Sequence, residues 1–353
     1  MKIVVAIDSM KGCLDSENAS EAMKSGLELA FPDAKIISVP VADGGEGTAE
    51  AIAKANRGVE RMHSVVEGPL GDPVNAEWWF NHDSSTAYMD MASAAGITLI
   101  AENDRNPLKT STYGVGQLIC KALESGADHI VVGMGGSATV DGGMGACRAL
   151  RECKCSAEIS LACDVIAPFT GDNGAARVFG PQKGATPEEV EILESKLEKI
   201  RQEVLLSCGI DLNAIPGSGA AGGCAGGLMA YCGAKIENGA KLVLDSIGFD
   251  NIVEDADLIV TGEGSADSQT LMGKLPSEIL RRGKMRGIPV VLVAGHVDGA
   301  EKLLDAGFSL IIDINSSENI NRSHTGGKDA MLPQTAKTRL KAVGKCIRDC
   351  SWA

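Results

Sequence analysis

The stretch Asp128-His-Ile-Val-Val-Gly-Met-Gly-Gly-Ser-Ala-Thr-Val-Asp-Gly-Gly-Met-Gly145 sets the fold expected for the chain. Its apolar first part predicts a strand, and its glycines, hydroxyls and carboxylate predict a loop that opens a helix. Glycine permits positive φ, so backbone N–H groups can converge on an anion, and a following helix N-terminus adds partial positive charge. Because Asp141 would repel a bare phosphate, the stretch indicates a divalent cation between carboxylate and phosphate, as in a magnesium nucleotide.

The same theme of an apolar run followed by an acidic glycine loop occurs at two other places. The three loops carry the carboxylates of Asp43 and Glu46, of Asp141, and of Glu263 and Asp267. A single Asp in such a loop is as well explained by a local turn. Three loops together favour a ligand site, because the carboxyl ends of strands in an open α/β sheet bind ligands and can meet at one cleft.

The segments on either side predict a wound α/β fold. Residues 2–7 form a β-rich apolar run, and apolar spacing from about Ser16 predicts a helix. Residues 289–314 predict two strands around a helix, and Pro187 after Thr186 predicts the start of a long amphipathic helix. The simplest topology joins both chain ends in one doubly wound sheet, with the middle of the chain as an inserted domain.

We therefore predict an α/β protein with two domains. Residues 1–67 and 279–353 are expected to form a Rossmann-like or flavodoxin-like domain, and residues 68–278 an inserted mixed α/β domain. A chain of 353 residues is long enough for two cores of ordinary size.

Composition limits the class of partner and the compartment. The net charge of −14 disfavours nucleic acids and anionic membranes, which attract basic surfaces. No run approaches the roughly 20 apolar residues of a membrane span, and the acidic Asp8 comes too early for a signal peptide. A cytoplasmic protein is expected. Its eleven cysteines lack zinc-site spacing and are expected to be reduced, structural thiols.

Two short matches to the dinucleotide fingerprint are present, at residues 133–138 and 217–222. The first continues as a loop where the fingerprint requires a helix, and the second lacks a preceding strand. The chain contains no P-loop motif, no histidine pair spaced for zinc and no serine elbow. Hydrolysis through an activated serine is therefore disfavoured.

Six segments together resemble the bacterial glycerate kinase family. The resemblance implies ATP-dependent phosphorylation of D-glycerate, usually at the 2-hydroxyl, with Mg²⁺. It also implies two α/β domains, one of them Rossmann-like and built from both chain ends, with the active site in the cleft between them. The segments are residues 8–12, 40–48, 106–114, 133–145, 179–186 and 261–270.

The resemblance and the loops together suggest a set of site residues. We expect the loops 133–145 and 217–227 to bind ATP, through Gly135, Gly136, Ser137, Thr139, Gly219 and Gly222. Magnesium is expected to bridge the phosphates to some of the loop carboxylates, namely Asp43, Glu46, Asp141, Glu263 and Asp267.

The catalytic and substrate groups are expected in the same loops. Either Asp141 or Asp267 accepts the glycerate hydroxyl proton, and Lys11 and Lys183 offset charge on the transferring phosphoryl group. Residues expected to bind the substrate are Asp8, Ser9, Thr110 or Ser111, and Lys274. The predicted product is 2-phosphoglycerate. Two alternatives are an NAD-dependent oxidoreductase of a small hydroxy acid and a non-catalytic sugar-acid-binding protein.

Overall fold

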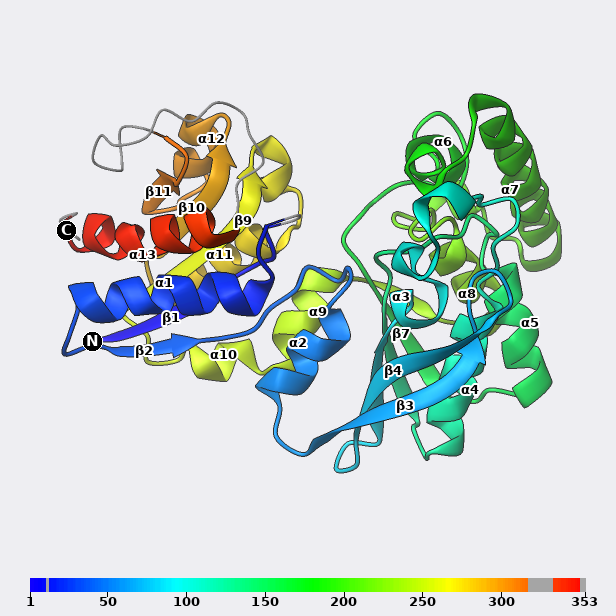
Figure 1. Cartoon of the computed structure of the whole chain (residues 1–353), viewed down its shortest axis with the longest axis horizontal. Coiled ribbons are helices and arrows are strands. Elements are labelled where there is room, and N and C mark those ends of the chain that lie inside the picture. The colour runs from blue at the N-terminus through cyan, green and yellow to red at the C-terminus, as the bar shows by residue number, and fades with distance from the viewer. Residues whose placement is uncertain (11–12, 317–332, 350–353) are drawn as a thin grey trace. The chain divides into compact units, whose positions relative to one another are not determined.

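The computed structural model describes residues 1–10, 13–316 and 333–349. They form an α/β fold, as the sequence predicted (Figure 1). The chain divides into two compact units, which we call the terminal unit (Met1–Asp43 with Val243–Ala353) and the central unit (Gly44–Leu242). These bounds differ from the predicted ones at 67/68 and 278/279.

The bounds differ because strand pairing extends the terminal unit at one end and shortens it at the other. Strand β9 (Leu258–Ala266) pairs with β1 (Lys2–Ile7), so the segment before residue 279 belongs to the terminal sheet. Strand β3 (Val59–Glu67) pairs with β4 (Pro73–Asn81), so residues 59–67 belong to the central sheet.

The terminal unit contains a parallel sheet in the order β11-β10-β9-β1-β2. When the five strands are numbered along the chain, this order is 2-1-3-4-5, which is the flavodoxin-like arrangement. The winding direction changes between β1 and β9. Burial is nearly complete along β1, as expected for a strand covered on both faces. The three remaining strands are β2 (Lys35–Ser38), β10 (Val290–Val297) and β11 (Leu310–Asp313).

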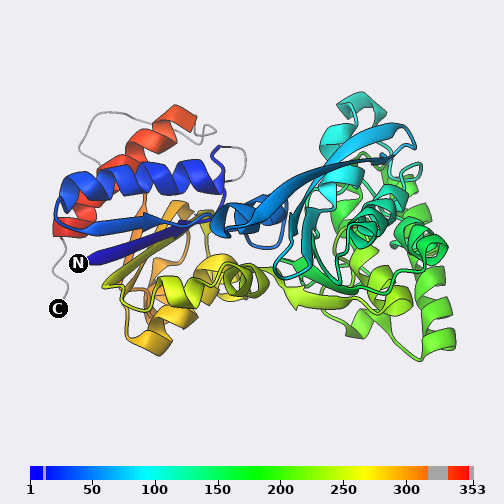
Figure 2. The ribbon, with the colours of Figure 1, turned by 90° about the horizontal axis from the view of Figure 1, so that it is seen from below.

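Helices cover both faces of the terminal sheet. Figure 2 shows α1 (Ser16–Ala30) and α13 (Pro333–Asp349) on one face, and α11 (Leu275–Arg286) and α12 (Ala300–Asp305) on the other. The helices α1 and α13 can approach closely because Gly344 has no side chain. A Cβ at that position would lie 2.3 Å from the carbonyl oxygen of Gly26. The short α10 (Phe249–Ile252) and the 3₁₀ turn Ser268–Leu271 complete the unit, and α9 (Gly239–Ser246) spans the boundary.

The central unit contains a mixed sheet in the order β3-β4-β5-β6-β7-β8. The first pairings, β3 with β4 and β4 with β5, are antiparallel, and the rest are parallel. The parallel part presents its carboxyl ends on one edge, where ligands bind in open α/β sheets. Its strands are β5 (Thr86–Asp90), β6 (His129–Gly133), β7 (Glu158–Cys163) and β8 (Lys235–Asn238).

Helix boundaries in the central unit follow local capping chemistry. The long α7 (Pro187–Cys208) has the predicted start, with Thr186 and Glu189 forming a capping box and Gly209 ending the helix at φ +70°. The other helices are α2 (Thr48–Ala55), α3 (Ala92–Ala95), α4 (Tyr113–Glu124), α5 (Met144–Cys153), α6 (Ala175–Phe179) and α8 (Cys224–Cys232). The 3₁₀ turns are Ile97–Leu99, Glu102–Asp104, Pro181–Lys183 and Leu212–Ala214.

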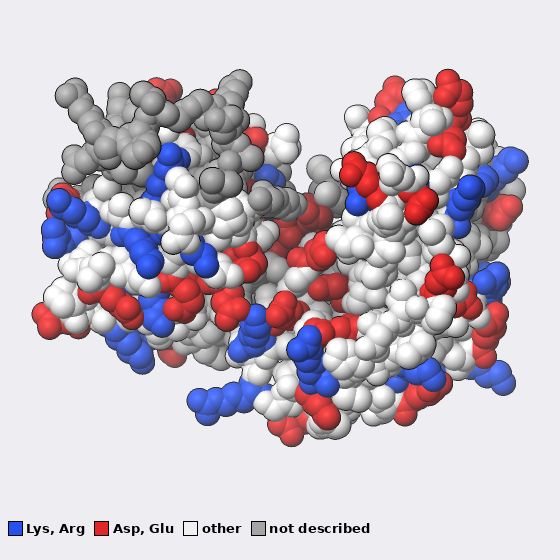
Figure 3. Space-filling model, in the orientation of Figure 1, with Lys and Arg blue, Asp and Glu red and all other residues white. Residues whose placement is uncertain are grey.

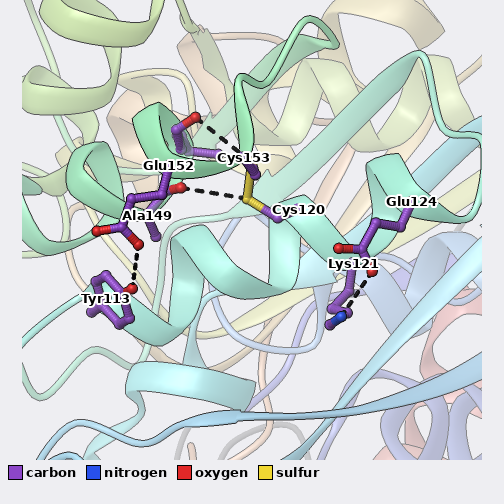
Figure 4. Close-up of a disulfide and its surroundings, with 8 residues drawn as sticks. Tyr113, Cys120, Lys121, Glu124, Ala149, Glu152 and Cys153 are labelled. Carbon is purple, nitrogen blue, oxygen red and sulfur yellow. Dashed lines mark hydrogen bonds and ion pairs between the residues drawn. A yellow bond between two sulfur atoms is a disulfide. The ribbon is translucent and has the colours of Figure 1, made fainter.

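A disulfide joins α4 to α5 through Cys120 and Cys153 (Figure 4). The two helices can approach closely because Gly116 has no side chain. A Cβ at that position would lie 2.5 Å from the carbonyl oxygen of Ala146. The expectation of reduced thiols is therefore wrong for this pair. The structure describes free thiols at Cys13, Cys147, Cys155, Cys163, Cys208, Cys224 and Cys232.

The described helices include none that is both long and apolar enough to cross a membrane. On the face of the central unit seen in Figure 3, acidic and basic side chains are interspersed. One exposed ion pair of the central unit joins Lys121 to Glu124. Exposed pairs of this kind contribute little to stability.

Candidate active site

At the carboxyl end of β6, the glycine loop packs against the acidic loop that precedes α2. A Cβ at Gly135 would lie 2.4 Å from the backbone nitrogen of Glu46, and a Cβ at Gly136 would lie 2.6 Å from a carboxylate oxygen of Glu46. These glycines are thus required for the contact between two loops. Gly135 and Gly136 remain partly exposed, so a ligand can still reach them. The Glu46 side chain is exposed to solvent.

A buried carboxylate holds the acidic loop in place. Asp90, the last residue of β5, accepts hydrogen bonds from the backbone N–H of Gly47 at 2.9 Å and of Ala49 at 3.1 Å. Burial raises the pKa of Asp90 to about 7, although the two N–H donors oppose this shift. Sequence reasoning missed Asp90. The available signal was an acidic residue that ends an apolar strand, as in the other acidic loops.

Lys183 lies buried beneath the glycine loop. Its Nζ atom donates to Ser137 Oγ at 2.7 Å and to the carbonyl oxygen of Thr139 at 2.8 Å. Only 4% of the lysine and 7% of Ser137 are exposed. Burial lowers the pKa of Lys183 to about 7, while the nearby Asp141 carboxylate opposes this shift. Three residues predicted from two separate motifs, 133–145 and 179–186, are thus brought together.

Asp141 joins the N-terminal ends of two helices. Its Oδ2 atom accepts hydrogen bonds from the backbone N–H and the hydroxyl of Thr112, which precedes α4, and from the N–H of Gly145. Its Oδ1 atom accepts from the N–H of Gly143, just before α5. Four donors occupy about as many sites as a carboxylate offers. We therefore assign Asp141 a structural role and do not retain it as base or metal ligand.

The predicted substrate hydroxyls beside α4 also have partners in the chain. Thr110 is buried and donates through Oγ1 to the carbonyl oxygen of Ala138 at 3.0 Å. The half-buried Ser111 accepts from the N–H of Tyr113 through Oγ at 3.1 Å. Thr110 is thereby committed to the protein, and Ser111 remains the more accessible of the two for a substrate carboxylate.

The glycine-rich segment 217–227 is buried throughout and packs against other backbone. A Cβ at Gly219 would lie 2.1 Å from the carbonyl oxygen of Pro168, and one at Gly222 would lie 2.0 Å from that of Thr139. Close packing therefore explains these glycines. Gly219 and Gly222 do not form a phosphate cradle, which corrects their predicted role in nucleotide binding.

The terminal unit carries a second group of predicted site residues at its switch point. Asp8 follows β1, is buried, and accepts through Oδ1 from the N–H of Ser9 at 2.7 Å. On the adjacent β9, Glu263 accepts from the hydroxyl of Thr270 at 2.6 Å and pairs with Lys274 Nζ at 3.4 Å. Burial raises the pKa of Glu263.

The remaining predicted residues contribute less. Asp267 is the N-cap of the turn Ser268–Leu271, where its Oδ1 atom accepts from the N–H of Gln269 at 2.7 Å. Asp43 is half-buried at the end of its segment of the terminal unit. Lys11 lies outside the described residues. Among the described residues, no group of three or more His, Cys, Asp or Glu side chains is placed to hold a metal ion.

The sequence and the fold were compared with those of known proteins. Residues 3–155 and 151–343 match the model of the glycerate kinase family. The glycerate 2-kinase of Escherichia coli K12 is 39% identical, with 91% of this chain and 93% of that protein covered. The glycerate kinase of Halalkalibacterium halodurans is 38% identical, with 95% and 96% covered. A solved structure from Salmonella typhimurium LT2, provisionally named glycerate kinase 2, has a TM-score of 0.79 at 34% identity and covers 99% of this chain and 97% of its own.

Proposed function

The chain belongs to the glycerate kinase family, and from this premise we propose that it transfers the γ-phosphoryl group of ATP to the 2-hydroxyl of D-glycerate, giving 2-phosphoglycerate. The observation that carries the proposal is the 2.7 Å contact between Ser137 and Lys183. It places a hydroxyl and an amine beside the partly exposed Gly135 and Gly136, at the carboxyl end of a parallel strand. Phosphoryl transfer needs mainly such positioning and charge stabilisation.

We assign the ATP phosphates to the loop from Gly135 to Thr139 in the central unit. Backbone groups of a glycine loop can approach a phosphate more closely than those of a loop with side chains. The substrate contact of the same unit is assigned to Ser111, and the other predicted substrate residues, Asp8, Ser9 and Lys274, lie in the terminal unit. Of these residues Lys274 is the one with a positive charge, and its ammonium can donate a charge-assisted hydrogen bond to the glycerate carboxylate.

The residues present also suit a magnesium ion. Mg²⁺ is usually bound by one or two carboxylates together with substrate phosphates, rather than by a cage of protein ligands. The exposed Glu46 of the central unit is of this type, and Asp43 and Glu263, which the sequence also suggested, lie in the terminal unit. When bound, the ion would neutralise charge on the phosphate oxygens.

The structure weakens the oxidoreductase alternative. One of the two dinucleotide fingerprints, residues 217–222, is buried against Pro168 and Thr139 and has no room for a pyrophosphate. A nicotinamide site would therefore have to use residues 133–138 alone, and there the helix that the fingerprint requires begins only at Met144.

The test is an ADP-release assay with ATP, Mg²⁺ and a panel of D-glycerate, L-glycerate and related hydroxy acids. ADP release that depends on D-glycerate is expected. The proton multiplicity in ³¹P NMR identifies the product, because phosphate on C2 couples to one proton and phosphate on C3 couples to two. Omission of ATP or chelation of magnesium should abolish turnover. Absence of ADP release above background with every acid would refute the proposed reaction.

A further inference from the structure

Lys183 is a buried lysine whose partners are not acidic. Among the residues that the structure describes, its Nζ atom bonds Ser137 Oγ and the carbonyl oxygen of Thr139, and no carboxylate is ion-paired with it. A buried ammonium normally requires a paired charge, because desolvation of an isolated ion is very costly. The surroundings of Lys183 therefore suit an uncharged amine better than an ammonium.

A neutral amine matches the two observed contacts. It has two N–H groups and one lone pair, so it can donate to the Thr139 carbonyl, and the 2.7 Å contact in which Nζ donates to Ser137 Oγ can also form in the reverse direction, with the serine hydroxyl donating to the amine. An ammonium would need a third acceptor. The charged or titratable groups that act on the amine are Asp141, before α5, and Cys224, the first residue of α8, and both favour the protonated form. Burial outweighs them and lowers the pKa of Lys183 to about 7.

Ser137 lies between the lysine and the proposed ligand site. It follows the partly exposed Gly136 directly, whereas Lys183 is almost wholly enclosed. The contact with Ser137 therefore gives a group at the loop a hydrogen-bonded route to the amine. This order resembles the general arrangement in which a hydroxyl is paired with a base at hydrogen-bond distance.

We propose that Ser137 and Lys183 together form the proton acceptor of the phosphoryl transfer, with Ser137 contacting the substrate hydroxyl and Lys183 acting through Ser137. The substrate hydroxyl proton passes to Ser137 Oγ as the proton of Ser137 passes to Lys183 Nζ. The substrate oxygen forms a bond to the γ-phosphorus, and the bond from that phosphorus to the β–γ bridging oxygen breaks, releasing ADP. The ammonium returns its proton to water through Ser137 after the products leave. This inference rests on the proposed function.

The carboxylates that the sequence suggested as bases are less suitable. Asp141 already accepts four hydrogen bonds from the N-terminal ends of α4 and α5. Asp267 caps its own 3₁₀ turn. The oxygens of Asp141 are thus already occupied by donors of the chain. Ser137 and Lys183 instead have a hydrogen bond along which a proton can move.

The first test compares Ser137→Ala and Lys183→Met with the wild-type chain. General-base catalysis typically contributes 10²–10⁴-fold, so each variant should lose kcat by about that factor with little change in KM for ATP. The wild-type kcat should fall as the pH decreases through about 7, where the amine becomes protonated. Lys121→Ala, which removes an exposed lysine of the same unit, is the matched control and should retain wild-type kcat.

The second test separates a base from a merely structural lysine. Lys183→Ala should regain activity when methylamine or ethylamine is added, in proportion to the concentration of the unprotonated amine. The acid limb of its pH profile should then follow the pKa of the added amine. Circular dichroism and thermal unfolding establish that each variant is folded. If Lys183→Ala does not fold, the kcat of Ser137→Ala alone decides the proton-acceptor proposal, because the proposal requires that this variant lose kcat.

The two proposals can fail separately. A wild-type chain that releases no ADP with any acid refutes the proposed function. An active wild-type chain whose Ser137→Ala variant retains kcat, whose folded Lys183→Met variant keeps the acid limb near pH 7, or whose folded Lys183→Ala variant is not rescued by amines, refutes the proton-acceptor role alone.

Discussion

The carboxylate of Asp90 accepts a hydrogen bond of 2.9 Å from the backbone N–H of Gly47, a residue 43 positions earlier in the chain. A second bond, from the N–H of Ala49, makes Asp90 the cap of α2 from a neighbouring strand. The capped turn begins one residue after Glu46, one of the proposed magnesium ligands. The position of this exposed carboxylate thus depends on a buried one.

Replacement of Asp90 by alanine should destabilise the central unit. It would leave the N–H groups of Gly47 and Ala49 without their acceptor, at about 1–3 kcal/mol for each buried donor. Urea unfolding measures the change in free energy. The exposed Asp128→Asn variant serves as control and should unfold like the wild type. An Asp90→Ala variant as stable as the control would contradict the capping role.

The stability contribution of Asp90 should also depend on pH. Its pKa is raised from 3.8 to about 7 by burial, so between these values the unfolded chain loses the proton that the folded chain retains. Stability falls with rising pH wherever the folded state binds more protons. The free energy of unfolding, relative to Asp90→Asn, should therefore decrease from about pH 4 to about pH 7. Urea titrations across this range check the direction, and an increase would be inconsistent with the shift.

Asp141→Asn should reduce stability although it preserves shape. The new NH₂ group cannot accept a hydrogen bond. Where it replaces Oδ2, the bonds from the N–H and hydroxyl of Thr112 are lost, and where it replaces Oδ1, the bond from the N–H of Gly143 is lost. The expected loss is about 1–3 kcal/mol, measured by urea unfolding. The exposed Asp104→Asn is the matched control. Unchanged stability would favour a purely catalytic Asp141.

Removal of the disulfide should destabilise the chain. Cys120 and Cys153 are 33 residues apart, and bonds that close loops of this order typically contribute about 2–4 kcal/mol. The Cys120→Ser/Cys153→Ser double variant should therefore unfold at a lower urea concentration than the oxidised wild type. Cys208→Ser, at an exposed free thiol, should have no such effect. Equal midpoints for the double variant and the wild type would rule out this contribution.

A pair of alanine substitutions tests whether the segment 217–227 is structural. Gly222 and Gly209 have nearly equal φ, +68° and +70°, but a Cβ at Gly222 would meet the carbonyl oxygen of Thr139, whereas one at Gly209 meets nothing within 4 Å. Gly209→Ala should cost only the left-handed strain, about 1–2 kcal/mol. Gly222→Ala should cost clearly more in urea unfolding. Similar losses would show that the segment has room to adjust.

Local patterns were sufficient to predict much of the fold. The bounds of β1 and the start of α7 were predicted correctly, because an apolar run and a Thr-Pro-Glu-Glu start are local signals. Domain boundaries depend on which strands pair, and pairing partners more than 200 residues apart, such as β1 and β9, leave no local pattern.

The chemistry of the site was less predictable. The motifs around Ser137 and Lys183 were identified separately, but their contact joins residues 46 positions apart, and only burial shows that the lysine is not an ordinary surface cation. For the glycines, the sequence suggested a ligand contact where the structure shows close packing of backbone. Because a missing side chain serves both ligand approach and close backbone packing, the sequence could not distinguish Gly135, which is partly exposed, from Gly222, which is buried.

The order of strands also has a consequence for biosynthesis. All strands of the central sheet lie within residues 59–238, so this sheet can be complete while the ribosome is still translating the rest of the message. The strand β1 is made first, but its partner β9 begins only at Leu258, and α13, which packs on α1, comes later still. Because domains of a nascent chain generally fold as units, the segment synthesised first should be among the last to be buried.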